Sequence, residues 1–327
     1  MEENSHILGH EKIEAFLART LTSGKVFPVW IFDGIYGIGK GTMARKFAKC
    51  LLAGVTPSTA SLDLPPENPV HRLVHLRIHP DFFVLEQKDE TVLLEEVRDL
   101  MAKIWKTPAL SHRKVLILEN ASTWSKNIYN ALLKVLEEPP EDTVIILICN
   151  GTGTLPKTLL SRTAKLSFGP LAIDRVQELL DSNQQERSRE LAELSGGSVG
   201  MALYLYHHHG LEIYDHLVAS FDHDQAVRQK QLGYLLDNKL CDNFFVVKNI
   251  FAKVLKDYWD VLAGIACKKN SALEKFAAGW PIPPNPDRET AKILEIIHML
   301  YLGHRLMLDK NALLVYAFAK MFARSYH

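Results

Sequence analysis

One stretch, Gly34–Thr42, most constrains how this chain can fold, because its glycines and lysine need a particular setting. It reads G-I-Y-G-I-G-K-G-T and follows a short apolar run, Val29–Phe32, which predicts a buried strand. The residues after it have helical periodicity to about Gly54. Strand, glycine-rich loop and helix in this order predict a phosphate-binding loop. Backbone N–H groups and the helix N-terminus would attract an anion, and Lys40 would reach its outer phosphates.

The loop departs from the usual pattern at one position. The motif G-x-x-x-x-G-K-[ST] has a hydroxyl directly after the lysine as a Mg²⁺ ligand, and this chain has Gly41 there. Backbone donors do not need that hydroxyl, so phosphate binding does not depend on it alone. The candidate nucleotide-binding residues of the loop are Gly34, Gly37, Gly39, Lys40, Gly41 and Thr42.

A second acidic motif follows the apolar run Val115–Leu118, which predicts a buried parallel strand. In many P-loop ATPases an Asp at such a strand end holds Mg²⁺, and a following Glu orients the attacking water. Here Glu119 stands at the metal position and Asn120 at the base position, where an amide cannot take a proton from water. Glu119 could equally cap the next helix. Hydrolysis at this site is therefore not expected.

Strands and helices alternate through the first half of the chain. Further strands are expected at 81–85, 144–148 and 165–168, with helical segments between them. This alternation predicts a parallel sheet covered on both faces. After residue 169 strand patterns become scarce, and helical periodicity continues to His327. We expect an α/β P-loop domain over 1–169, a small helical lid domain over 170–206 and an all-α domain over 207–327.

Composition limits the classes of function. The chain has 47% hydrophobic and 23% charged residues and a formal net charge of +0, so no overall field favours nucleic acid. Four scattered cysteines without a C-x-x-C pair argue against a disulfide framework and a four-cysteine zinc site. The N-terminus is acidic, and no apolar run approaches the ~20 residues that span a bilayer. A cytoplasmic protein without a membrane partner is expected.

Several motifs together resemble a known family. The most specific is Asn130–Pro140, N-A-L-L-K-V-L-E-E-P-P, and it is accompanied by His79–Phe82, Lys114–Ala121 and Leu160–Thr163. In order and spacing these resemble the AAA+ clamp-loader subunits that serve bacterial DNA polymerase III. The resemblance covers roughly residues 8–205, and the C-terminal helices by length and class. It implies an AAA+-type first domain and a C-terminal collar through which subunits assemble.

The resemblance also implies roles for single residues. Ser161-Arg162-Thr163 resembles a Ser-Arg-Cys motif whose arginine reaches the ATP of a neighbouring subunit, so Arg162 would be a catalytic arginine finger acting in trans. Asn150 falls at a polar sensor position, where it could bond a phosphate or cap a helix. Gly200 stands where active members have a second sensor arginine. The chain is therefore most similar to members without their own ATPase activity.

Cofactors and partners follow from the same resemblance. No cofactor is required, although ATP or ADP could bind at the vestigial loop without hydrolysis. No zinc is expected, and a metal site at His71, His75 and His79 is disfavoured because Pro80 and loop-like flanks interrupt a helix there. The expected partners are the ATPase subunits and the clamp-opening subunit, with the sliding clamp and primer–template DNA contacted through the complex.

Three other functions compete with this one. An active clamp-loader ATPase would need Thr42 to supply the missing hydroxyl and Glu119 to act as both metal ligand and base. A nucleoside monophosphate kinase is suggested by the G-x-G-K-G-T pattern, but the sequence shows no arginine-rich lid and leaves the long helical tail unexplained. Direct DNA binding would need a basic stripe with aromatics, which the sequence lacks.

Overall fold

The computed structural model describes residues 9–55, 61–86, 93–151, 155–182, 185–222, 224–237, 243–262, 286–305 and 308–322. The chain divides into two compact units. The first contains the described residues up to Val176 together with Gly197–Gly200, and the second contains Gln177–Gly196 and the described residues from Met201 onward. The expected separation of residues 170–206 from 207–327 as distinct domains stays a prediction.

A five-stranded sheet forms the centre of the first unit. All its neighbouring strands pair in parallel, in the order β2-β3-β4-β1-β5. Their carboxyl ends therefore lie at one edge of the sheet, where open α/β sheets bind ligands. The strands are β1 (Val29–Gly34), β2 (Phe82–Leu85), β3 (Lys114–Leu118), β4 (Thr143–Cys149) and β5 (Ala164–Phe168).

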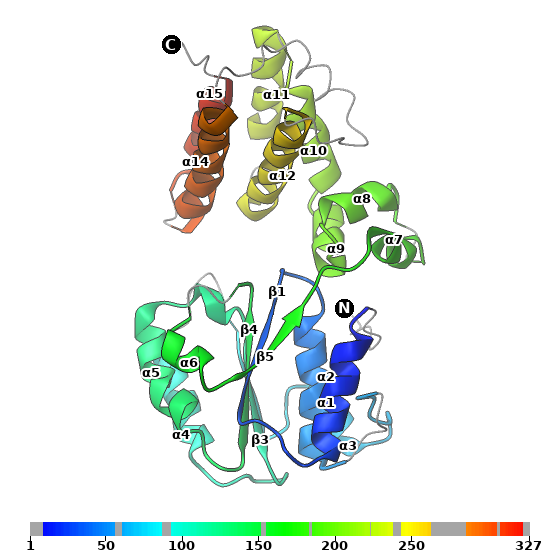
Figure 1. Cartoon of the computed structure of the whole chain (residues 1–327), viewed down its shortest axis with the longest axis vertical. Coiled ribbons are helices and arrows are strands. Elements are labelled where there is room, and N and C mark those ends of the chain that lie inside the picture. The colour runs from blue at the N-terminus through cyan, green and yellow to red at the C-terminus, as the bar shows by residue number, and fades with distance from the viewer. Residues whose placement is uncertain are drawn as a thin grey trace. The chain divides into compact units, whose positions relative to one another are not determined.

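Helices cover both faces of this sheet (Figure 1). One face packs against α1 (Glu11–Thr22), α2 (Lys40–Ala53) and α3 (Pro69–His75). The other packs against α4 (Leu94–Ile104), α5 (Lys126–Glu137) and α6 (Lys157–Leu160). Because successive strand residues point to opposite faces, Trp30 and Phe32 join the first core and Val29 and Ile31 the second. Burial on both faces explains the unbroken apolar runs and confirms the predicted fold class.

Local signals set the helix ends near the predicted positions. Helix α2 begins after Gly39 and ends at Ala53; its C-cap is Gly54, whose φ of +62° is a left-handed conformation that favours glycine. Ser125 takes the N-cap position of α5, but its side chain accepts no capping hydrogen bond. Helix α5 ends at Glu137, two residues before the Pro139-Pro140 pair.

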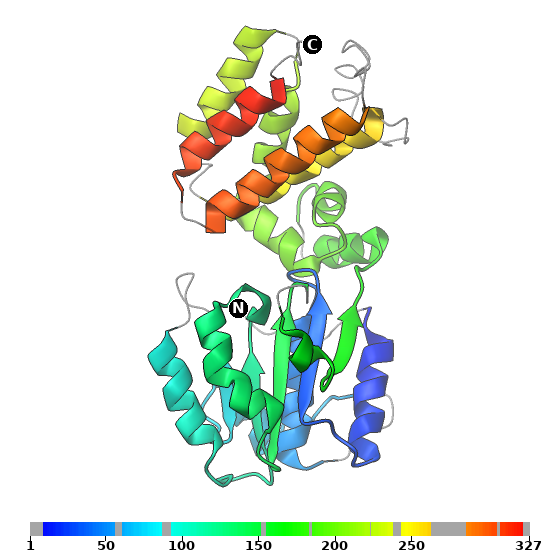
Figure 2. The same cartoon turned by 60° about the vertical axis from the view of Figure 1, so that its left-hand side comes forward.

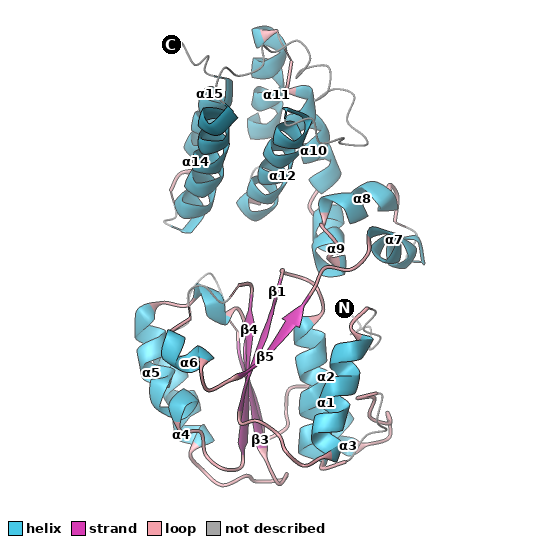
Figure 3. Ribbon diagram, in the orientation of Figure 1, coloured by secondary structure: helices cyan, strands magenta, loops and turns pink. Residues whose placement is uncertain are grey.

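After β5 the described chain is helical (Figure 3). Helix α10 packs against α11 and α12, and α14 packs against α12 and α15; Figure 2 shows α14 in orange alongside α12 in yellow. On α12, Phe251, Val254, Leu255 and Tyr258 recur at the spacing of one helix face and are buried. The helices are α7 (Ile173–Ser182), α8 (Ser188–Leu194), α9 (Val199–His207), α10 (Gly210–Ala219), α11 (Gln225–Asp237), α12 (Phe244–Leu262), α14 (Pro286–Arg305) and α15 (Lys310–Phe322).

Candidate functional site

The glycine-rich loop lies between the carboxyl end of β1 and the N-terminus of α2, as the sequence predicts. Gly37 and Gly39 have φ angles of +75° and +99°, a region in which side chains with a Cβ are strained. Gly39 is the N-cap of α2, and its carbonyl accepts the hydrogen bond from the Met43 N–H at 2.9 Å. These two glycines therefore allow the left-handed turns that the loop makes before α2.

Gly34 has a different physical role from the other loop glycines. A Cβ added at Gly34 would lie 2.5 Å from the carbonyl oxygen of Phe168. Gly34 and Phe168 are register partners at the ends of β1 and β5, so the glycine allows the two backbones to approach each other. The structure thus explains Gly34 by strand packing, independently of any ligand.

Lys40 is buried and points back into the loop. Its Nζ donates hydrogen bonds to the Gly34 carbonyl at 2.7 Å, the Ile35 carbonyl at 2.6 Å and Asn150 Oδ1 at 2.9 Å. Burial lowers the pKa of Lys40 to about 8, although the nearby Asp33 opposes the shift. The lysine expected to reach phosphates is therefore bonded to the chain's own oxygens, one of which belongs to the predicted sensor residue Asn150.

Residues Ser198–Gly200, which belong to the same unit as the loop, pack directly against it. The Ser198 hydroxyl donates to the Tyr36 carbonyl at 2.7 Å, and the Gly200 N–H donates to the Gly37 carbonyl at 2.8 Å. A Cβ at Gly200 would lie 2.7 Å from Gly37 Cα, a distance that real Cβ atoms do not tolerate against backbone. A second sensor arginine at this position is thus sterically incompatible with the observed loop.

Glu119 follows β3 at the same edge of the sheet, but its partner is a cation of the protein. Its Oε1 accepts a hydrogen bond from Arg45 Nη2 at 2.6 Å. Burial raises the pKa of Glu119, and the Arg45 charge opposes that shift. The described contacts place this carboxylate against α2, and not at a helix cap. A divalent cation does not fit this arrangement, because the guanidinium already holds the carboxylate.

Asn120 adopts a left-handed conformation with φ of +52°. Its Oδ1 accepts a long hydrogen bond of 3.4 Å from Asn150 Nδ2, so the two predicted strand-end amides lie together. Their donors and acceptors could orient a polar ligand, but neither amide can act as a general base. The geometry gives no described residue the role of water-activating base on β3.

Arg162 lies apart from this edge. It is exposed and follows α6, just before β5 begins at Ala164. In the register of the sheet Ala164 faces Trp30, whereas Phe168 faces Gly34, so about four strand rises, or ~13 Å, separate the start of β5 from the loop level. Among the residues that the structure describes, none forms a hydrogen bond or ion pair with its guanidinium. Arg162 therefore has no described contact with its own phosphate loop.

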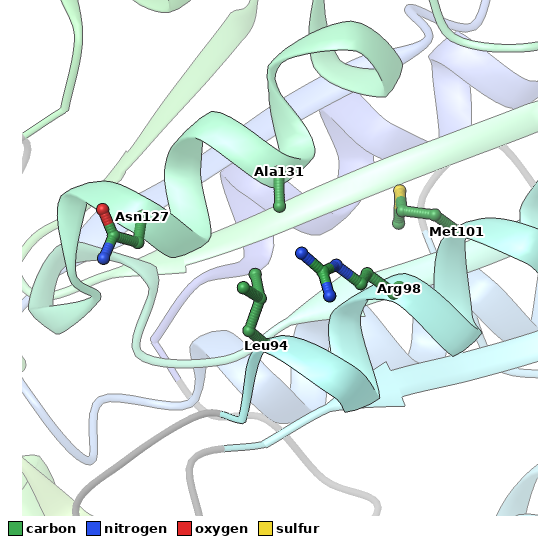
Figure 4. Close-up of a pocket in the computed structure, with 5 residues that line it drawn as sticks. All are labelled: Leu94, Arg98, Met101, Asn127 and Ala131. Atoms are coloured by element: carbon green, nitrogen blue, oxygen red, sulfur yellow. The ribbon is translucent and has the colours of Figure 1, made fainter.

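A separate pocket of about 440 Å³ lies between α4 and α5. Leu94, Arg98 and Met101 of α4 line it together with Asn127 and Ala131 of α5, and Figure 4 shows the Arg98 side chain reaching into the space between the helices. The residues recur at intervals of three and four, which places them on the facing sides of the two helices. None of the predicted site residues lines this pocket.

The sequence interpretation missed Arg45 and the role of Asp81. Arg45 lies one helical turn after Gly41, and this i, i+4 spacing was the available signal. Asp81 is buried and accepts hydrogen bonds from three backbone N–H groups, those of Ala109, Leu110 and Ser111, each at 2.7 Å. Burial would raise the pKa of Asp81, but these donors outweigh it and lower the pKa below its usual value. Asp81 thus ties the start of β2 to the loop before β3.

The histidines of the disfavoured metal site are separated by the structure. His71 and His75 lie on α3. His79 lies beyond that helix, where its Nδ1 accepts from the Asp81 N–H at 3.1 Å and its Nε2 lies 3.3 Å from the Ser111 hydroxyl. Within the described ranges no group of three His, Cys, Asp or Glu side chains could hold a metal ion.

The strand order, with the glycine-rich loop after β1 between β4 and β5, defines an AAA+-type P-loop protein. The family model described as "DNA polymerase III, delta subunit" matches residues 9–172, half of the chain. The chain belongs to this family of clamp-loader proteins, which confirms the resemblance found in its motifs.

Individual relatives agree with this family. The chain is 34% identical over 175 residues to DNA polymerase III subunit delta′ of Pseudomonas aeruginosa, covering 52% of each chain. It is 28% identical over 213 residues to DNA polymerase III subunit gamma of Buchnera aphidicola, covering 62% of this chain and 57% of that protein. The matches thus span little more than half the length of these curated relatives.

Among solved structures, a DNA polymerase III gamma subunit-related protein from Thermotoga maritima has a TM-score of 0.49 and 16% identity, over 94% of this chain and 97% of that one. That similarity is too low to carry an argument about function. In the part of the chain that the structure describes, no helix is both long and apolar enough to cross a bilayer.

Proposed function

We propose that this protein is a delta-prime-type subunit of the DNA polymerase III clamp loader. It would help to load the ring-shaped sliding clamp onto primed DNA during replication, and such work on DNA would place it in the cytoplasm. The match of residues 9–172 to the family carries this proposal. Its partners would be the ATPase subunits and the clamp-opening subunit, with clamp and primer–template DNA contacted through the complex.

Within that assembly we expect no independent ATP hydrolysis by this chain. Three features support this expectation: Glu119 is held by Arg45, Asn120 cannot act as a base, and Gly200 packs on the loop. ATP or ADP could bind without hydrolysis only if Lys40 exchanged its carbonyl partners for phosphate oxygens. No cofactor is needed for the proposed role, and zinc has no part in it.

The chemical contribution of the chain would come from Arg162. An exposed guanidinium offers several N–H donors in a planar fork, which suits the oxygens of a phosphate carried by a neighbouring subunit. In phosphoryl transfer, an arginine supplied in trans stabilises the transition state and contributes about 10³–10⁵-fold in rate. Arg162 would thereby complete the active site of the adjacent ATPase.

Reconstitution with the other subunits tests this role. We expect Arg162→Ala to reduce the DNA-stimulated ATPase rate of the complex by at least ~10-fold while the complex still assembles, and Arg162→Lys to recover only part of it. The matched control is Arg72→Ala. Arg72 is also an exposed arginine but lies on α3, and its loss should leave the rate unchanged. An unchanged rate in the Arg162→Ala complex would refute the finger assignment, and robust turnover by the chain alone would refute the loss of hydrolysis.

A further inference from the structure

Four charged side chains meet near the carboxyl ends of β2 and β3. Arg45 Nη2 lies 2.6 Å from Glu119 Oε1 and 3.3 Å from Glu86 Oε1. Glu86 Oε1 also accepts an ion pair from Arg77 Nη2 at 2.7 Å. The Arg45 and Glu119 side chains are only 18% and 22% exposed, so their pairing is shielded from water. A carboxylate in such a place needs a positive partner, because an unpaired buried charge is costly.

The position of Arg45 relative to Gly41 shows which positive partner of Glu119 the arginine replaces. Gly41 and Arg45 are i, i+4 neighbours on α2 and share one face of the helix. A Cβ added at Gly41 would lie 3.8 Å from Glu119 Oε1 and 3.0 Å from Arg45 Nη1. A hydroxyl side chain at 41 would therefore lie next to the Glu119 carboxylate, the pair of ligands that a metal-binding P-loop requires. A metal ion between this hydroxyl and Glu119 would therefore occupy the volume that the Arg45 guanidinium fills.

We propose that the Arg45 guanidinium takes the place of the divalent cation in this loop, and that Gly41 and Arg45 act as a coupled pair. Gly41 leaves room for the guanidinium, and the guanidinium neutralises Glu119. A planar guanidinium suits this role because its separate N–H groups can serve Glu119 and Glu86 at the same time. The loss of the metal-binding hydroxyl at position 41 then accompanies the replacement of the divalent cation by the Arg45 guanidinium.

This inference rests on the proposed loss of hydrolysis and extends it by naming the group that excludes the metal. The full chain is unfolded thermally with EDTA or with millimolar MgCl₂ and no nucleotide. The wild type should not respond to Mg²⁺. We expect Arg45→Ala to melt about 5 °C lower in EDTA and to recover at least half of that loss in Mg²⁺, because the ion binds the carboxylates of the folded state only.

Matched variants identify the carboxylate involved. Arg77→Ala also removes a cation from Glu86 but leaves the Arg45–Glu119 pair, so it should gain no response to Mg²⁺. Adding Glu119→Gln to Arg45→Ala should abolish the rescue. The proposal is overturned if Arg45→Ala shows no Mg²⁺ response, or if Mg²⁺ stabilises the wild type equally.

A second measurement covers the case in which Arg45→Ala does not fold. Arg45→Gln keeps most of the side-chain volume without the charge, and bound Mn²⁺ can be counted by electron paramagnetic resonance. We expect Arg45→Gln to bind Mn²⁺ and Gly41→Thr alone to bind none, whereas Gly41→Thr with Arg45→Ala should bind it about 10-fold more tightly than Arg45→Gln. Failure to gain Mn²⁺ in every variant would refute the exchange. The Arg162→Ala result in the reconstituted complex would be unaffected, so the two proposals fail separately.

Discussion

The packing of Gly200 against the phosphate loop predicts that a glycine-to-alanine substitution in a helix will lower the stability of the protein. Replacing an exposed helical glycine with alanine normally stabilises a protein by about 0.5–1 kcal/mol. At Gly200, the second residue of α9, the new Cβ would lie 2.7 Å from Gly37 Cα and 2.8 Å from its carbonyl oxygen. Both are backbone atoms, so no side-chain rotation can relieve the contact.

The size of the destabilisation follows from the steric contact and from the hydrogen bond that would be lost. Overpacking costs about 1–3 kcal/mol, and separating the segments also loses the 2.8 Å hydrogen bond from the Gly200 N–H to the Gly37 carbonyl, worth about 1 kcal/mol. After subtraction of the alanine propensity, Gly200→Ala should destabilise the first unit by about 1–3 kcal/mol, a fall in melting temperature of roughly 3–10 °C.

The assay is thermal unfolding followed by circular dichroism, together with amide hydrogen exchange of the loop from Gly34 to Lys40. Gly233→Ala on α11 is the matched control, because a Cβ at Gly233 meets no atom within 4 Å. It should stabilise by up to about 1 kcal/mol. If Gly200→Ala stabilised the protein as Gly233→Ala does, with unchanged exchange in the loop, the packing of Gly200 against the loop would be refuted.

Three further predictions follow from Asp81, Gly34 and the two buried cysteines. Because the folded state lowers the pKa of Asp81, the stabilising effect of its charge is complete above its unfolded pKa of about 4 and is lost as the pH falls through the folded pKa. Asp81→Asn should therefore lower the free energy of unfolding in urea by about 2–4 kcal/mol at pH 7 and by less at pH 3. A loss independent of pH would contradict this. Gly34→Ala should lower the yield of folded protein, because its Cβ would lie 2.5 Å from the Phe168 carbonyl oxygen; a normal melting temperature would show that β5 moves freely. Burial raises the pKa of Cys50 and of Cys149 to about 12, so a thiol reagent at pH 8 should modify both only at the rate of unfolding, and immediate reaction of either would show it to be exposed.

The sequence by itself determined the parts of this protein that depend on neighbouring residues. Apolar runs such as Val115–Leu118 predicted strands buried on both faces, and the glycines before Lys40 predicted the loop at the start of α2, because strand periodicity and backbone freedom are local properties. The Asn130–Pro140 motif predicted the family that the comparison of residues 9–172 confirmed.

Only the tertiary structure decided which charges and backbones meet at the loop. Arg45 and Glu119 are separated by 74 positions, and no local pattern pairs them; the parallel sheet brings the end of β3 beside the first turns of α2. In the same way, the chain after β5 returns Gly200 to the carbonyl of Gly37. A motif read along the chain therefore predicted a phosphate cradle at Gly34–Thr42. The long-range contacts add the Arg45 guanidinium beside this loop and Gly200 packed against it. Only the folded chain places these groups within hydrogen-bond distance of their partners.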